Sequence, residues 1–342
     1  MGPLQLGDRL AELLSTRYGL ANPILVGRDV RGMSSANCVI ADGDASYFLK
    51  VYNPKRFRER ILEIHAAEEY FFHHGVPAIV PLKCLDGESV FEFEDRFYSL
   101  FPFVHGRVLD RLPNERGAAS MGDMLARIHL ASRTDDSLEV VRQMRGWDRE
   151  RFLDDANALL LRLTHVVHPP VHPLALVMLR KKIALAETTA LRFEDMGFRN
   201  DSILHGDYHY GNVFFDRDDH VTHVFDFERV RRGARAAEVA EGIFLNCFGM
   251  NLEGDDPITD SHIRLAERFI AGYTQAYPMM HSEIAQGLWW YFYAQMVHDV
   301  WPLNEHYLAG DRRADRILAK RYDRLTYFAH HLDEVVAKLC HV

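Results

Sequence analysis

The spacing of apolar positions changes along the chain from a mixture of strand and helix patterns to helix patterns alone. Residues 7–18 carry leucines at helical spacing, and Gly75 and Pro77 end a second helical stretch at residues 58–74. Short apolar runs bounded by turn residues predict strands. These runs occupy residues 24–26, 37–40, 46–52, 80–85, 89–93 and 96–103. From Pro113 onward helical periodicity dominates, which predicts a small sheet-bearing region followed by a larger helical one.

A strand pattern returns briefly inside the helical region. Two apolar runs at residues 213–215 and 223–225 flank the acidic stretch 216–219, which predicts a hairpin. Such a hairpin returns the chain so that Asp226 lies near Asn212. Gly206 and Gly211 relieve the steric limits on a tight loop just before the hairpin.

Three polar residues of this stretch match the needs of phosphoryl transfer. The reaction requires a carboxylate beside the attacking hydroxyl and two oxygen ligands that hold Mg²⁺ against nucleotide phosphates. Asp207, Asn212 and Asp226 supply these groups. A loop, a hairpin and a buried acid with structural roles alone are the competing interpretation, which is weaker because several positions agree at once.

The motif His205-Gly206-Asp207-x-His209-x-x-Asn212, followed by Asp226-Phe227-Glu228, resembles the aminoglycoside phosphotransferase and choline kinase family. The resemblance implies an α+β, two-lobed, protein-kinase-like fold with a small antiparallel-sheet N-lobe and a larger, mainly helical C-lobe. It implies ATP and Mg²⁺ as cofactors, Asp207 as catalytic base, and Asn212 and Asp226 as metal ligands. Glu228 is a candidate at the second metal position. His209 favours the branch that acts on small molecules.

Three further candidates for ATP binding lie in the strand region. Lys50 is flanked by apolar residues, and burial of an ammonium group requires an anion close by. The resemblance suggests the α- and β-phosphates of ATP, with a helix glutamate holding the lysine. Glu63 is the first choice for that glutamate, and Glu68 is the second. Ser34 and Ser35 occupy the segment where a loop would cover the phosphates, although an ordinary turn explains them equally well.

The change from strands to helices predicts an interlobe hinge at about residues 100–106. Residues 1–103 would form the nucleotide-binding lobe and residues 104–342 the catalytic and acceptor-binding lobe. Backbone groups at Phe101 and Phe103 would meet the adenine edge, and Pro102 between them has no N–H to donate.

Two features of the helical region bear on the site. Glu238 stands where members of the resembled family commonly have an aspartate that braces the catalytic loop, which puts the geometry of this brace in doubt. The aromatic block at residues 288–301 has His298, Asp299 and Glu305 nearby. Aromatic stripes at helical spacing are usually core, so packing is preferred there over an acceptor pocket.

Composition excludes several other classes of protein. The chain has 342 residues, 48% of them hydrophobic, and a formal net charge of −9. That charge argues against a nucleic-acid partner, and no apolar run is long enough for a membrane span. The four cysteines show neither metal-site nor disulfide-scaffold spacing. A cytoplasmic location with no membrane partner is therefore expected.

The sequence thus predicts a kinase that uses ATP and Mg²⁺ to phosphorylate a hydroxyl group. The acceptor is expected to be a small molecule of the aminoglycoside, choline-like, homoserine or sugar-like kind. One alternative is a protein serine/threonine kinase, because residues 61–65 are similar to the corresponding helix of bacterial stress response kinase A. The other is a nucleotide-binding regulatory module without turnover, against which the intact trio Asp207, Asn212 and Asp226 argues.

Overall fold

The structure is a computed structural model of the chain. It describes residues 8–29, 37–53, 56–133, 137–140, 142–144, 146, 148–165, 173–189, 198–200, 202–250, 257–300, 303 and 315–340. Ser34 and Ser35, proposed to cover the phosphates, lie outside these ranges.

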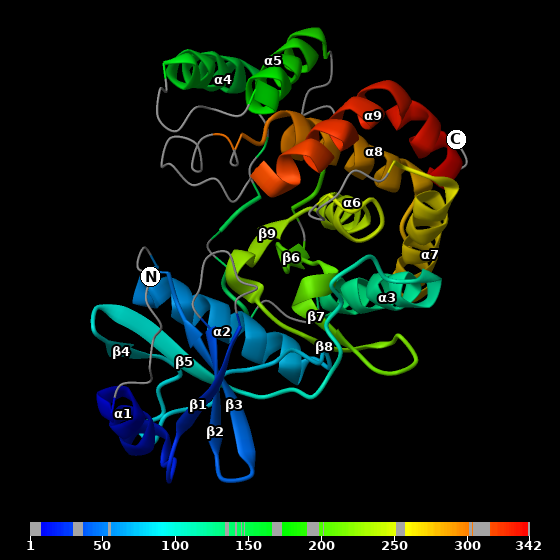
Figure 1. The fold of residues 1–342 in the computed structure, drawn as a ribbon. Coiled ribbons are helices and arrows are strands. Elements are labelled where there is room, and N and C mark those ends of the chain that lie inside the picture. The colour runs from blue at the N-terminus through cyan, green and yellow to red at the C-terminus, as the bar shows by residue number, and fades with distance from the viewer. Residues whose placement is uncertain are drawn as a thin grey trace.

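The N-terminal lobe is built on a five-stranded antiparallel sheet with strand order β1-β2-β3-β5-β4 (Figure 1). The strands are β1 (Ile24–Asp29), β2 (Asn37–Asp42), β3 (Ala45–Val51), β4 (Phe91–Phe93) and β5 (Arg96–Pro102). The Asp42-Gly43 turn joins β2 to β3. The strand predicted at residues 80–85 is wrong, since that segment has no ladder and Leu82 donates to Leu100 through a single backbone bond.

Two helices accompany this sheet, α1 (Asp8–Tyr18) and α2 (Arg58–His73). The α2 helix buries Ile61 and Ile64, and it places Phe71 against Phe227 of the other lobe with ring centroids 5.2 Å apart. This stacking ties α2 to the segment that carries Asp226.

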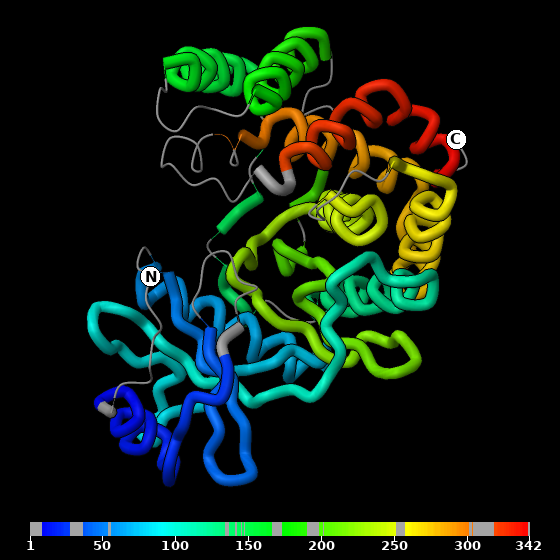
Figure 2. Tube along the Cα trace, in the orientation of Figure 1, coloured from blue at the N-terminus to red at the C-terminus, as the bar shows by residue number. Residues whose placement is uncertain are grey.

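The C-terminal lobe is mainly helical, as expected. Its helices are α3 (Glu115–Ala131), α4 (Arg149–Thr164), α5 (Pro173–Thr188), α6 (Arg235–Asn246), α7 (Asp260–Ala276), α8 (His281–Tyr291) and α9 (Asp315–Cys340). A π-helical turn, η4 (Phe292–Val297), continues α8. Figure 2 shows the chain running from the sheet lobe in blue and cyan to these helices in green to red. None of the described helices is long and apolar enough to cross a membrane.

Two short strand pairs lie where the lobes meet. Strand β6 (Ser202–Leu204) pairs with β9 (Arg231–Gly233), and β7 (Val213–Phe215) pairs with β8 (Val221–Val224), both antiparallel. The segment Leu204 to Glu228 therefore sits between the sheet lobe and the helices. The boundary near residues 100–106 stays a prediction.

Candidate active site

The predicted hairpin brings Asn212 and Asp226 together. Val213 pairs with Val224, and the N–H of Phe225 donates to the carbonyl of Asn212 at 2.9 Å. The side-chain nitrogen of Asn212 donates to the carbonyl of Asp207, also at 2.9 Å. Because the amide nitrogen of Asn212 is engaged in this bond, its amide oxygen is the atom that would ligate a metal.

Asp226 has a backbone conformation that is rare for aspartate. Its φ of +69° and ψ of +62° lie in the left-handed region, which costs free energy for residues other than glycine. Burial acts to raise the pKa of Asp226, but the Lys50 ammonium at 2.8 Å holds it below its ordinary value. The ionised carboxylate is the form that ligates a metal, so this electrostatic setting suits a metal site.

Lys50 is buried, with 1% of its surface exposed, and two carboxylates surround it. Its Nζ lies 2.8 Å from Asp226 and 3.0 Å from Glu228. Burial acts to lower the pKa of Lys50, but Asp226 and Glu228 outweigh it and raise the pKa. The sequence predicted an anion beside this lysine, and the carboxylates of Asp226 and Glu228 supply it. Phosphate oxygens would be further anionic partners of Lys50 when a nucleotide binds.

The geometry favours Glu68 over Glu63 as the helix glutamate that acts on Lys50. Glu63 forms an ion pair with Arg60 at 2.6 Å on its own helix. Glu68 is fully buried, and Lys50 is the cation whose charge acts on it. Burial raises the pKa of Glu68 well above its ordinary value, and the charge of Lys50 counteracts this only in part. Glu68 is therefore the buried helix glutamate on which Lys50 acts.

Glu228 is engaged by cations through both carboxylate oxygens. Oε1 accepts from Lys50 at 3.0 Å and Oε2 from Arg56 at 2.9 Å. A role at the second metal position therefore stays a prediction, because the arrangement shows an ion-pair role for Glu228 in holding Lys50.

Glu238 holds the catalytic loop by hydrogen bonds. It is a glutamate where the resembled family commonly has the shorter aspartate. The N–H groups of His205 and Gly206 both donate to its carboxylate, the first at 3.1 Å. His129 contacts the same carboxylate at 2.8 Å and Tyr273 at 2.8 Å through its other ring nitrogen. The glutamate therefore reaches the loop that an aspartate braces in the resembled family, and His129 is a hydrogen-bonded core residue.

Phe101 and Phe103, the two hinge candidates, differ in their contacts. Phe101 is fully buried, and its ring meets that of Phe225, next to Asp226, edge to face at 5.3 Å. The N–H of Phe103 donates to the carbonyl of Ser46 at 3.3 Å, so this N–H is already engaged. Adenine contacts at both residues stay predictions.

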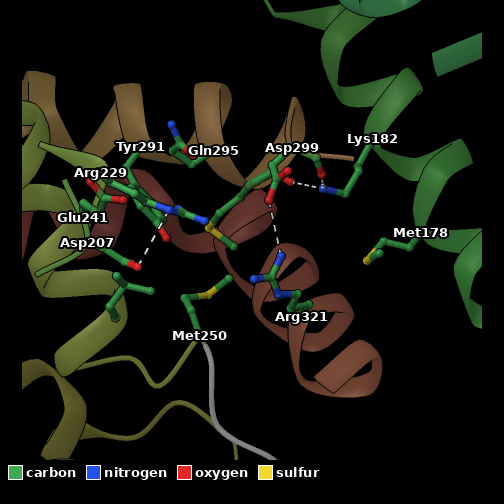
Figure 3. Close-up of a pocket in the computed structure, with 12 residues that line it drawn as sticks. Met178, Lys182, Asp207, Arg229, Glu241, Met250, Tyr291, Gln295, Asp299 and Arg321 are labelled. Carbon is green, nitrogen blue, oxygen red and sulfur yellow. Dashed lines mark hydrogen bonds and ion pairs between the residues drawn. The ribbon is translucent and has the colours of Figure 1, made fainter. Parts of the chain in front are cut away.

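A cavity of about 90 Å³ opens beside Asp207 in the helical lobe (Figure 3). Its charged residues include Asp207 and Arg229, whose Oδ2 and Nε are 3.8 Å apart, and Asp299 and Arg321, 3.4 Å apart. Burial raises the pKa of Glu241, on the same wall, to about 7. The lining residues are Met178, Lys182, Asp207, Arg229, Glu241, Leu245, Met250, Tyr291, Gln295, Met296, Asp299 and Arg321.

Sequence reasoning preferred packing for the aromatic block, and the structure supports both interpretations in part. Trp290 and Phe292 are core, whereas Tyr291 and Asp299 line the cavity. Lys182, Glu241 and Arg321 were missed. The sequence feature that could have identified them is a charged residue on an otherwise apolar helix face. Such a residue indicates either a buried ion pair or a ligand site, and the sequence does not distinguish the two.

Lys182 holds the π-helical turn in place. Its Nζ donates to the carbonyl of Asp299 at 2.7 Å and to that of Met296. A π-helical turn leaves helix carbonyls without regular partners and is frequent at functional sites. Burial lowers the pKa of Lys182 to about 8. The ammonium therefore supports the cavity wall at an electrostatic cost.

This cost predicts a pH-dependent stability. The folded-state pKa of about 8 lies below the ordinary value of 10.5, so the unfolded chain binds the Lys182 proton more tightly. As pH rises from 8 to 10.5, the free energy of unfolding of the wild type should rise relative to Lys182→Met by roughly 2 to 3 kcal/mol. Urea unfolding of both proteins at pH 7.5, 9 and 10.5 measures the difference. A difference that stays constant with pH contradicts the prediction.

Asn212 and Asp226 offer two oxygen ligands, which suits Mg²⁺ better than a metal whose ligands all come from the protein. Among the described residues, no group of three or more His, Cys, Asp and Glu side chains could hold a metal ion. Mg²⁺ typically takes one or two protein oxygens and completes its shell with phosphates and water. The amide oxygen of Asn212 and the carboxylate of Asp226 are such a pair.

Comparisons with known proteins found a matching family model and similar chains. The family model, described as the phosphotransferase enzyme family, matches residues 28–282. A homoserine kinase of Bradyrhizobium diazoefficiens is 25% identical over 283 residues, which cover 81% of this chain and 78% of that protein.

Solved structures of similar shape include two small-molecule kinases. A spectinomycin phosphotransferase in complex with ADP and spectinomycin has a TM-score of 0.62 at 15% identity, covering 99% of this chain and 98% of its own. A choline kinase from Cryptosporidium parvum has a TM-score of 0.63 at 10% identity, covering 98% of each chain. The expected α+β, two-lobed, protein-kinase-like fold is confirmed.

Proposed function

The chain belongs to the phosphotransferase enzyme family, and on that premise we propose that it uses Mg²⁺ and ATP to phosphorylate a hydroxyl group of a small molecule. The observation that carries the proposal is the juxtaposition of Asp207, Asn212 and Asp226 around one hairpin, with buried Lys50 beside Asp226. The ADP complex of the spectinomycin phosphotransferase supports the choice of an adenine nucleotide.

In the proposed reaction, Asp207 accepts the proton of the acceptor hydroxyl. The acceptor oxygen forms a bond to the γ-phosphorus while the bond from that phosphorus to the β,γ-bridging oxygen breaks, and ADP leaves with the bridging oxygen. Lys50 steadies the α- and β-phosphates, and Glu228 and Glu68 hold the lysine. Bound Mg²⁺, held by Asn212 and Asp226, neutralises charge on the phosphates.

Positioning and electrostatics supply most of the rate in such a reaction, because no covalent enzyme intermediate forms. Asp207 is 29% exposed and faces the cavity, so an acceptor there lies within reach of its carboxylate. Arg229 lies beside this base, with its Nε 3.8 Å from the Oδ2 of Asp207.

The charges of the cavity point to the class of acceptor. Its described lining holds three cations, Lys182, Arg229 and Arg321, and three acids, Asp207, Glu241 and Asp299. A balanced wall suits a molecule with both a positive and a negative group, because each finds an opposite charge and no net charge is buried. The acids Glu241 and Asp299 match an ammonium group, and Arg321 matches a carboxylate. A hydroxy amino acid fits this pattern, and the homoserine kinase relative supports it.

Other acceptor classes fit the described lining less well. A polycationic aminoglycoside needs an excess of acids, which the described lining does not have. A choline-like quaternary ammonium favours several aromatic faces, whereas Tyr291 is the one aromatic side chain among the residues that line the described cavity.

An acceptor screen tests the proposal. The purified protein, labelled ATP and Mg²⁺ are incubated with homoserine, serine, choline, a sugar, an aminoglycoside or a generic protein substrate. We expect transfer to hydroxy amino acids, with kcat/KM at least about 10-fold above that for choline or the aminoglycoside, since unpaired buried charges disfavour the latter. ATP binding without transfer to any acceptor or to water would support the regulatory module instead. Labelling of protein alone would support the protein kinase.

A further inference from the structure

Glu238 and Arg231 both hold the backbone that leads to Asp207. Glu238 accepts from the N–H groups of His205 and Gly206. In the next peptide group, Nη1 of Arg231 donates to the carbonyl of Gly206 at 2.9 Å. The residue bonded to this carbonyl carbon is Asp207, so a shift of Arg231 moves the peptide bond that orients the base.

Arg231 also connects this peptide to the cavity wall. Its second terminal nitrogen, Nη2, donates to Oε2 of Glu241 at 2.9 Å. Glu241 lines the cavity together with Asp207, and Figure 3 shows it beside Arg229. Glu238 and Glu241 lie three residues apart on α6, which places both carboxylates on the face that meets the catalytic loop.

Arg231 and the catalytic loop are closely packed around Gly206. Gly206 has a φ of +86°, and a Cβ built on it would lie 2.1 Å from the carbonyl oxygen of Arg229 and 2.8 Å from Nη1 of Arg231. Arg231 is also opposite Leu204 in the β6–β9 pair. A tightly packed arrangement transmits displacement instead of absorbing it.

We infer that Arg231 and Glu241 form a positioning pair that links the acceptor cavity to the catalytic loop. Arg231 sets the position of Asp207 through the Gly206 carbonyl, and Glu241 holds Arg231 while facing the acceptor. A positive group of the acceptor bound at Glu241 therefore shares a carboxylate with the side chain that orients the base. The inference rests on the proposed transfer to a small acceptor.

Kinetics of single variants test the pair. Arg231→Met should lower kcat by about 10- to 100-fold, because small misplacements of a reacting group have effects of that size, and leave KM for ATP within about twofold. Arg231→Lys should recover part of kcat, since a lysine reaches one of the two acceptors but lacks the planar fork that spans both. Glu241→Gln keeps an oxygen that accepts from Arg231. It should therefore change kcat by less than about threefold and raise the acceptor KM by about 10-fold, the loss expected for one charged contact.

A second measurement does not depend on turnover. Hydrogen exchange read by mass spectrometry on peptides covering residues 202–210 should speed up in Arg231→Met, because the loop loses the hydrogen bond at the Gly206 carbonyl. If Arg231→Met does not fold, Arg231→Lys carries both measurements.

Arg235→Met is the matched control. Arg235 is 16% exposed against 18% for Arg231, and it likewise bonds one carbonyl, that of Pro278 at 2.9 Å, and one glutamate, Glu283 at 3.4 Å. Equal kcat and equal exchange in the two methionine variants would overturn the inference. If the wild type transfers phosphate to no acceptor, the proposed function is wrong. The hydrogen-exchange comparison would still decide whether Arg231 supports the loop.

Discussion

Replacing Asp207 by asparagine is expected to lower kcat by about 10²- to 10⁴-fold, the contribution typical of a general base. The amide is nearly the same shape as the carboxylate but cannot accept the hydroxyl proton. The ion pair with Arg229 at 3.8 Å is also lost, yet both side chains are partly exposed, so stability should change little. Steady-state kinetics with the best acceptor from the screen measure the effect.

Two controls separate the loss of a base from general damage. The dissociation constant for ATP, measured by calorimetry in the presence of Mg²⁺, should be unchanged in Asp207→Asn. Asp154→Asn makes the same chemical change at an exposed position of α4, far from the hairpin (Figure 1), and should retain wild-type kcat. A rate for Asp207→Asn within about threefold of the wild type would rule out Asp207 as the base.

Replacing Asp226 by asparagine is expected to have an effect of similar size through the metal. Loss of a charged ligand to Mg²⁺ removes several kcal/mol of transition-state stabilisation, which corresponds to about a 10³-fold lower kcat. Asparagine tolerates the left-handed backbone at this position, where φ is +69°, so the fold should survive. Lys50 keeps Glu228 at 3.0 Å as a charged partner.

The decisive measurement for Asp226 is a titration of activity with Mg²⁺. The concentration for half-maximal rate should rise at least about 10-fold in Asp226→Asn, since one of two protein ligands loses its charge. Asp95 is an exposed aspartate with a φ of +57° in the turn before β5, so Asp95→Asn controls for the backbone conformation. An unchanged Mg²⁺ requirement in Asp226→Asn would remove this residue from the metal site.

The sequence predicted local structure at this site well because the relevant contacts are close along the chain. The acidic stretch 216–219 and its flanking apolar runs specify a hairpin, and a hairpin brings Asn212 and Asp226 together whatever the rest of the fold does. Lys50 follows the same logic. Its apolar neighbours bury it, so an anion had to be near, although the sequence did not show that Asp226 and Glu228 would both be present.

The choice between Glu63 and Glu68 shows where such reasoning fails. The two residues are five positions apart on α2 and so point about 140° apart around the helix axis. Both interpretations are compatible with a helix at residues 58–74. Only the packing of α2 between the sheet and Phe227 selects the face that meets Lys50, and that face carries Glu68.

By itself the sequence determined the helix and strand regions, the catalytic loop and its hairpin, and the family motif, because these depend on residues within a few turns of one another. The tertiary structure alone decided the acceptor cavity. Its charged side chains come from α5, α6, α9 and the segments after β6, β8 and η4. They are up to 139 residues apart along the chain, between Lys182 and Arg321. Their meeting depends on how helices pack, and a pattern along one helix records which face is buried but not which partner buries it.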